Sequence, residues 1–108
     1  MASYMVQVAY TPEAWASLVK SPQNRLEAVR PAVENLGGKV EGSWLSFGEY
    51  DAVIIAQMPD QVSAAALSIA FAAGGALKAC KTTPLMSAEE GLEAMKKASG
   101  AGYRPPSG

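Results

Sequence analysis

Residues 50–60 read YDAVIIAQMPD, and the prediction of the fold begins with them. Every side chain from Ala52 to Ala56 is apolar, which is typical of a strand that is buried on both faces. Pro59 ends the strand because proline has no backbone N–H to donate, and Asp60 is a favourable helix N-cap. The stretch therefore predicts a strand over about residues 50–58 that is followed at once by a helix.

The rest of the chain alternates between strand and helix patterns. Alternating or continuous apolar residues indicate strands, and apolar residues spaced three and four apart indicate helices. Thr11 followed by Pro12 is typical of a helix start, whereas Pro31 predicts a kink or a restart within its helix. The expected segments are strand 4–10, a short helix from residue 12, helix 23–36, strands 39–47 and 50–58 joined by a tight turn at 48–49, helix 61–73, strand 76–83 and helix 87–98.

This order of elements is the βαββαβ order of the ferredoxin-like arrangement, followed by one further helix. It predicts an α+β fold: a four-stranded antiparallel sheet, two main helices on one face, and an appended C-terminal helix with an inward stripe of Leu92 and Met95. A length of 108 residues fits one domain. We expect that domain to cover residues 1–98, and residues 99–108, rich in glycine and proline, to form a flexible tail.

The strands at 4–10 and 50–58 are apolar on both faces, although two helices can cover only one face of the sheet. The other face would then be an apolar patch larger than a soluble monomer normally exposes. Another chain, the appended helix or both must cover it. We therefore expect a homo-oligomer built on a dimer that is joined through the sheet.

Composition excludes several kinds of chemistry. The chain has no histidine and a single cysteine, Cys80, so neither histidine-dependent catalysis nor a thiolate metal cluster is expected. We predict no metal and no other cofactor. Nine Lys and Arg against ten Asp and Glu, without clustering, predict no nucleic-acid partner. No secretory signal or membrane-spanning stretch is recognisable, so we expect a cytoplasmic protein without a membrane partner, in which Cys80 packs as a small hydrophobe.

Three stretches carry a resemblance to a known family: RLEAV at 25–29, LGGKV at 36–40 and GEYDAV at 48–53, followed by Pro59-Asp60. Together they resemble the GYD domain family of small bacterial and archaeal proteins, over about the first 95 residues. That family is named for a Gly, Tyr, Asp turn, here Gly48, Tyr50 and Asp51 with Glu49 inserted. The resemblance implies ferredoxin-like chains of the dimeric α/β-barrel type, in which two sheets pack face to face. The family's biochemical role is not established.

The turn residues support two interpretations. In the structural one, Gly48 adopts a backbone conformation closed to other residues, Asp51 accepts hydrogen bonds from turn amides, and the Tyr50 ring packs. In the functional one, Tyr50 and Asp51 line the mouth of a pocket between the sheet and the helices. A carboxylate beside a phenol can orient a substrate or relay a proton.

Four aromatic residues are expected on strands, namely Tyr4, Tyr10, Trp44 and Phe47. They are expected to fill the dimer core, where aromatic rings supply much of the buried area. In the alternative interpretation, Tyr10 and Trp44 join Tyr50 and Asp51 in binding a ligand.

Two classes of function follow from these observations. The first is a homo-oligomeric, non-catalytic module that binds a small molecule or a protein partner. The second is a cofactor-independent enzyme, of the oxygenase or isomerase type, that acts on a small apolar or aromatic metabolite. We favour the module. A solvent-open cleft lined by Trp44, Tyr50 and Asp51 would favour the enzyme.

Overall fold

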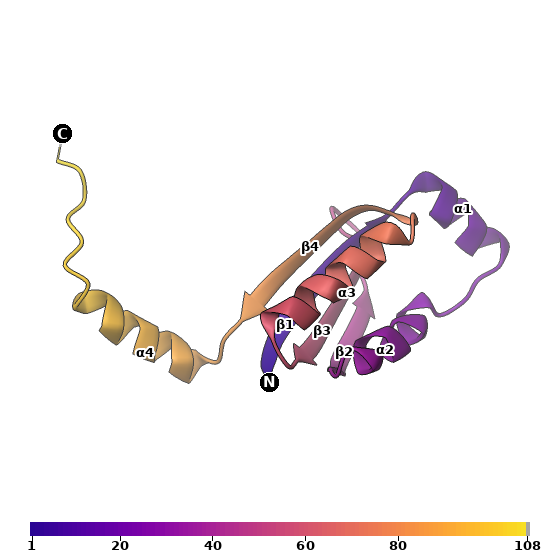
Figure 1. Cartoon of the computed structure of the whole chain (residues 1–108). Helices are drawn as coiled ribbons and strands as arrows, with labels where there is room; N and C mark the ends of the chain where they lie inside the picture. The colour runs from indigo at the N-terminus through magenta and orange to yellow at the C-terminus, as the bar shows by residue number, and fades with distance from the viewer. Residues whose placement is uncertain (108) are drawn as a thin grey trace.

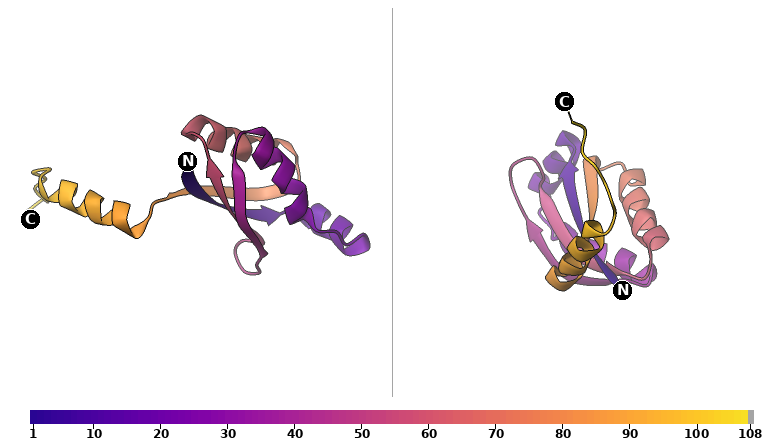
Figure 2. Two further views of the ribbon diagram at one scale, coloured as in Figure 1. Left: turned by 90° about the horizontal axis from the view of Figure 1, so that it is seen from below. Right: turned by 90° about the vertical axis from the view of Figure 1, so that its left-hand side faces the viewer.

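The computed structural model describes residues 1–107 and contains four strands and four helices (Figure 1). Their bounds are β1 Ala2–Tyr10, α1 Pro12–Lys20, α2 Arg25–Asn35, β2 Lys39–Leu45, β3 Ala52–Met58, α3 Gln61–Ala73, β4 Leu77–Leu85 and α4 Ala88–Ser99. The strands form one antiparallel sheet in the order β2-β3-β1-β4. Helices α2 and α3 lie together on one face of this sheet (Figure 2). The predicted ferredoxin-like α+β fold is confirmed.

The core lies between the sheet and the two helices. Alternate residues of β1 and β3 point into it, so that Val6 and Ile54, which are partners in the antiparallel register, are almost fully buried. Val33 of α2 and Leu67 of α3 close the core from the helix side. The burial of these side chains is the main favourable term in the folding of the chain.

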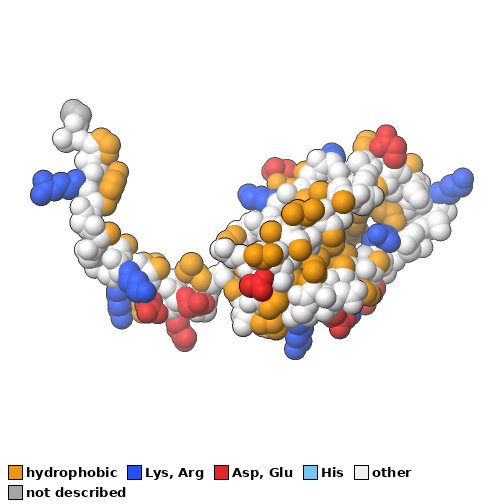
Figure 3. Space-filling view, in the orientation of Figure 1, with side chains coloured by type: hydrophobic (Ala, Val, Ile, Leu, Met, Phe, Trp, Pro, Cys, Tyr) orange, Lys and Arg blue, Asp and Glu red, His pale blue; other side chains and the backbone are white. Residues whose placement is uncertain are grey.

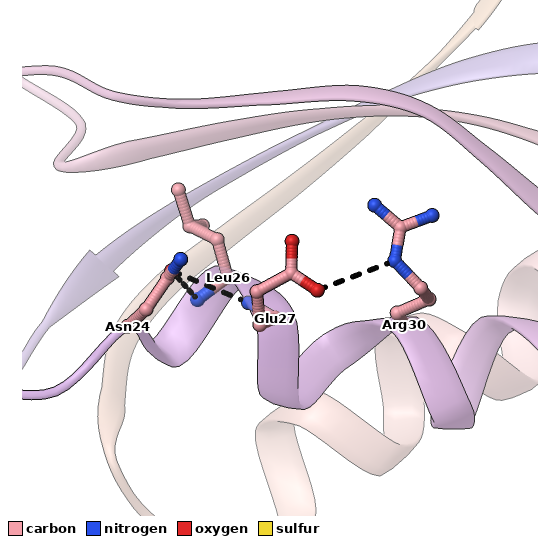
Figure 4. A network of polar contacts seen from close by, with 4 residues as sticks. All are labelled: Asn24, Leu26, Glu27 and Arg30. Carbon is pink, nitrogen blue, oxygen red and sulfur yellow. Dashed lines mark hydrogen bonds and ion pairs between the residues drawn. The ribbon is translucent and has the colours of Figure 1, made fainter.

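Each helix begins at a side chain that accepts a hydrogen bond from the first turn. Thr11 caps α1, Asn24 caps α2 and Asp60 caps α3, and Ser87 and Glu90 form a reciprocal capping box on α4. The Asn24 amide oxygen accepts from the backbone N–H groups of Leu26 and Glu27 (Figure 4). These caps satisfy backbone donors that have no partner inside the helix.

Three local expectations differ from the structure. α2 runs through Pro31 as one helix, so of the two predicted alternatives, a kink or a restart, the restart does not occur. The tight turn at Gly48 and Glu49 is instead a longer loop over residues 46–51, closed by a 2.7 Å hydrogen bond from the Ser46 N–H to the Asp51 carbonyl oxygen. Phe47 consequently lies in this loop rather than on a strand, and its side chain is fully exposed.

No helix of residues 1–107 covers the second face of the sheet (Figure 2), and we call it the open face. It consists of Ser3, Met5, Gln7 and Ala9 from β1, Lys39, Glu41, Gly42 and Trp44 from β2, Val53, Ile55 and Gln57 from β3, and Ala79, Lys81, Thr83 and Leu85 from β4. Its centre is apolar, whereas polar and charged side chains lie around that centre. The expectation that β3 is buried on both faces therefore does not hold within one chain: Val53 and Ile55 are only partly buried.

α4 does not cover the open face. It projects from the end of β4, away from the sheet and from the other helices (Figures 1 and 2). The radius of gyration is accordingly 17.4 Å, against about 13 Å for a globular domain of this length. Leu92 and Met95 are 53% and 69% exposed, so the predicted inward stripe points to solvent in the isolated chain.

Candidate ligand-binding site

A cavity of about 170 Å³ lies between β1, β3, α2 and α3. Its apolar wall is formed by Val8, Leu26, Val29, Ile54, Phe71 and Leu77. Figure 3 shows hydrophobic side chains gathered over and beside α3, on the side of the molecule where this cavity lies. The C-terminal part of α3 and the turn after it contribute only small residues, Ala70, Gly74 and Ala76. These residues leave the space unfilled, and the cavity forms there.

Two polar side chains reach the apolar wall, Tyr10 from the end of β1 and Arg25 from the first turn of α2. The pKa of Tyr10 is raised because burial disfavours the phenolate; the positive charge of Arg25 opposes this shift, and the negative charge of Asp51 adds to it. At neutral pH the Tyr10 hydroxyl therefore stays protonated and can donate a hydrogen bond. Arg25 supplies a positive charge beside it.

Arg25 forms no ion pair within residues 1–107. The pair that does form joins the Arg30 Nε to the Glu27 Oε2 at 3.4 Å on the outer surface of α2 (Figure 4). The two arginines of α2 thus differ in surroundings, because Arg30 is paired with a carboxylate and Arg25 lines the cavity. The Arg25 guanidinium is available to an anionic group.

A second hollow of about 480 Å³ adjoins the cavity and shares Tyr10, Arg25 and Leu26 with it. It lies beside α1, whose Trp15 ring packs edge-on against Tyr10 with a centroid distance of 5.3 Å and an interplanar angle of 78°. Edge-to-face pairs of this kind are favourable and hold both rings in place. The two polar groups therefore lie at the junction of an inner apolar cavity and a wider outer one.

Asp51 lines neither hollow but stabilises the wall of this site. Its Oδ2 accepts a hydrogen bond from the backbone N–H of Tyr10 at 2.9 Å and another from the Trp15 Nε1 at 3.3 Å. The Asp51 N–H in turn donates to the Val8 carbonyl oxygen at 2.8 Å. These partners come from β1 and α1, far from the turn amides that the structural interpretation expected. The carboxylate fixes the junction between β1 and α1 and so positions the Tyr10 ring.

The remaining candidates lie elsewhere. Tyr50 is partly buried in the 46–51 loop, and its carbonyl oxygen accepts a hydrogen bond of 2.8 Å from the Ser46 hydroxyl. Gly48 has a φ of +143°, which L side chains rarely adopt, as the structural interpretation of the turn requires. Trp44 lies on the open face, where its ring covers Gly42. Neither Tyr50 nor Trp44 lines the cavity beside Tyr10.

Arg25 was not singled out as a site residue from the sequence, although it opens the RLEAV stretch. Its one local signal is a cation in the first turn of a helix, where the helix dipole disfavours positive charge. Cys80 lies on the helix-covered face of β4, packed against the core, and burial raises the pKa of its thiol. Within residues 1–107, no helix is both long and apolar enough to cross a membrane.

The fold and the sequence were compared with known proteins. Ribosomal protein S6 of the 30S subunit from Thermotoga maritima superposes with a TM-score of 0.58 at 15% identity, covering 92% of this chain and 97% of that one. FFRP-DM1 superposes with a TM-score of 0.51 at 11% identity, covering 80% of this chain and all of that one. At such identities these similarities show the fold alone.

No curated protein matches the chain in sequence. The family model of the GYD domain, in contrast, matches residues 4–95. This range includes β1 from Tyr4 onward, the other three strands, the helices that cover the sheet and most of α4. The resemblance seen in the three short stretches is confirmed, and the chain belongs to the GYD domain family.

Proposed function

We propose that this protein is a homodimeric, non-catalytic module that binds a compact apolar carboxylic acid in the cavity between the sheet, α2 and α3. The observation that carries the proposal is the meeting of Arg25 and Tyr10 at the mouth of an otherwise apolar cavity. An apolar wall favours a hydrocarbon body, and a guanidinium beside a phenol favours a carboxylate that accepts hydrogen bonds from both.

The volume sets the size of the ligand. A cavity of about 150 Å³ in another protein holds one benzene molecule, and the cavity of this chain has about 170 Å³. A single ring or a branched aliphatic chain of similar size therefore fits the inner part. The carboxylate would lie outward, at the junction with the wider hollow beside α1, where Arg25 and Tyr10 both reach it.

The chemistry of the lining supports binding rather than turnover. Among the described residues, Tyr10 and Arg25 are the titratable side chains that line the cavity. The Tyr10 hydroxyl stays protonated at neutral pH because its pKa is raised by burial, and arginine does not release its proton in proteins. Neither group can act as a general base. The Asp51 carboxylate, which accepts a hydrogen bond from the Tyr10 backbone, accepts a second one from Trp15.

The open face supports the dimeric part of the proposal. Its centre consists of Met5, Trp44, Val53 and Ile55, which no helix of the same chain covers. The chain exposes 7,496 Å² to solvent, against about 5,700 Å² for a folded protein of its mass. The projecting α4 contributes to this excess (Figure 1), so the dimeric part of the proposal rests on the uncovered apolar centre of the open face. A second copy seated on the open face would form a two-sheet core.

Ligand binding is tested by titrating the ¹⁵N-labelled protein with sodium benzoate and, as a neutral analogue of the same shape, benzamide. Benzoate is expected to shift the amide resonances of Val8, Leu26 and Phe71, and benzamide to bind at least fivefold more weakly. Arg25→Gln should abolish this preference. Arg30→Gln is the matched control, because Arg30 lies on the same helix but pairs with Glu27. Equal binding of both probes, or no shift at millimolar benzoate, would disprove the ligand class.

The dimer is tested separately by sedimentation equilibrium at micromolar concentration. Ile55→Lys places a charge at the centre of the open face and should yield monomers. Val62→Lys is the control, because Val62 is 79% exposed on α3, away from the open face. A wild-type protein that sediments as an 11.2 kDa monomer would overturn the dimer and leave the ligand site to be judged by the titration.

A further inference from the structure

α4 is a well-formed amphipathic helix, and within residues 1–107 none of its side chains is buried. A complete capping box at Ser87 and Glu90 satisfies its N-terminus. Leu92 and Met95 are three residues apart and therefore lie on one helix face, and both are more than half exposed. We call this pair the α4 stripe. An amphipathic helix owes most of its stability to burial of its apolar face. Packing of the α4 stripe against a partner would therefore stabilise the helix.

The charges of α4 indicate what kind of partner fits. Its first half carries Glu89, Glu90 and Glu93, and its last turn carries Lys96 and Lys97. Helices that lie on membranes are rich in Lys and Arg on their polar face, whereas this helix has more carboxylates than ammonium groups. Its charges match the helix dipole instead. The α4 stripe is therefore suited to a protein surface rather than to anionic lipid.

The position of α4 indicates which protein surface lies within reach. A shallow hollow at the base of the helix is lined by Ser3, Ile55 and Leu85 of the open face together with Met86 and Glu90. Leu85 and Met86 are 36% and 65% exposed. Two exposed apolar side chains, Leu85 and Met86, therefore lie between the open face and the start of α4, in a hollow that polar side chains also line. Whatever covers the open face also meets the start of α4.

We propose that α4 is an exchanged arm: in the homodimer, each α4 packs its stripe against the second copy that is seated on the open face. The inference rests on the dimeric part of the proposed function. The twelve residues of α4 span about 18 Å, and stacked sheets lie about 10 Å apart. The helix is thus longer than the spacing between two stacked sheets. Because a two-fold dimer repeats each contact, both arms are buried at once.

The test compares dimer dissociation constants of full-length variants by sedimentation equilibrium. Leu92→Glu combined with Met95→Glu makes the stripe polar and keeps good helix formers in place. It should raise the dissociation constant at least tenfold. Lys97→Glu is the control, because it also lowers the net charge by two but lies on the opposite side of the helix. It should change the constant less than threefold.

A second measurement locates the arm. In a Cys80→Ser background, Leu92→Cys labelled with a benzophenone maleimide is irradiated in a mixture of ¹⁵N-labelled and unlabelled protein. Cross-links between labelled and unlabelled copies, on peptides of the open-face strands or the segments beside them, are expected. Cross-links confined to one copy would overturn the inference.

The outcomes separate the inference from the proposed function. If Ile55→Lys disrupts the dimer and the stripe variant leaves the dissociation constant unchanged, the open-face interface is retained and the exchanged arm is overturned. A monomeric wild-type protein would overturn both. Binding of the stripe to phosphatidylserine vesicles, with a dimer unaffected by its substitution, would also overturn the arm.

Discussion

The Asp51 carboxylate and the Trp15 indole, 36 residues apart in the chain, are joined by a 3.3 Å hydrogen bond from Nε1 to Oδ2. The same oxygen accepts from the Tyr10 backbone N–H. Asp51 thus links the loop before β3 to the end of β1 and to α1. In this chain it orders the wall of the cavity on which the proposed ligand would rest.

Asp51→Ala is expected to lower the free energy of unfolding by about 2 kcal/mol, because hydrogen bonds to a charged group contribute about 1.5–3 kcal/mol each and this site is partly buried. Urea denaturation followed by circular dichroism measures the loss. Tyr50→Phe is the control in the same loop, since its hydroxyl makes no hydrogen bond within residues 1–107. An Asp51 variant as stable as the wild type would contradict the supporting role.

Two glycines of the same sheet region should respond differently to alanine. A Cβ at Gly38 would lie 2.5 Å from the Gln57 carbonyl oxygen and from the Met58 Sδ, so backbone and core must move. Such overpacking costs about 1–3 kcal/mol. A Cβ at Gly42 would meet only the far edge of the Trp44 ring, at 2.6 Å.

Because Trp44 is 56% exposed, its ring can swing aside. Gly42→Ala is therefore expected to cost less than Gly38→Ala in thermal denaturation, and in a Trp15→Phe background it should shift the fluorescence of Trp44. Equal losses of melting temperature would show that the ring is held more firmly than its exposure indicates.

Gly48→Ala tests backbone strain alone. No atom lies within 4 Å of the added Cβ, whereas the φ of +143° is unfavourable for any L side chain. The expected loss is about 1–3 kcal/mol. Gly91→Ala within α4 is the opposite case, because the space there is also open and alanine is the better helix former by about 1 kcal/mol. In chemical denaturation, the Gly91→Ala variant should be more stable than the wild type and the Gly48→Ala variant less stable.

The stability of the protein should fall at alkaline pH through Tyr10. Its pKa is raised in the folded chain by burial, with Arg25 opposing and Asp51 adding to the shift. The folded state therefore binds the phenolic proton more tightly than the unfolded state does. This contribution is present below the ordinary tyrosine pKa of about 10 and is lost as the pH rises through the folded value. In Tyr10→Phe, the free energy of unfolding, measured by urea denaturation, should fall less steeply between pH 9.5 and 11.5. A variant with the same pH dependence as the wild type would argue against a raised pKa of Tyr10.

Local signals in the sequence were sufficient for most of the elements. Thr11, Asp60 and Ser87 each precede a helix and accept hydrogen bonds from its first turn, so their effect depends only on residues that are close in the chain. The positive φ of Gly48 is a property of one residue. Strand patterns are equally local, and the order of the elements then leaves few arrangements of the sheet. The extent of the loop over 46–51 was missed, because Phe47 and Tyr50 favour strands by type.

The amino-acid sequence by itself determined the order of the helices and strands, where the capped helices α1, α3 and α4 begin, and that the two main helices can cover only one face of the sheet. The tertiary structure decided which side chains meet across long separations: Asp51 with Trp15 and Tyr10, and Arg25 with Tyr10 beside a cavity. It also decided that Leu92 and Met95 point to solvent. Propensity, capping and periodicity act between near neighbours, whereas a site and a covered surface depend on how distant elements pack, and packing has no local signature.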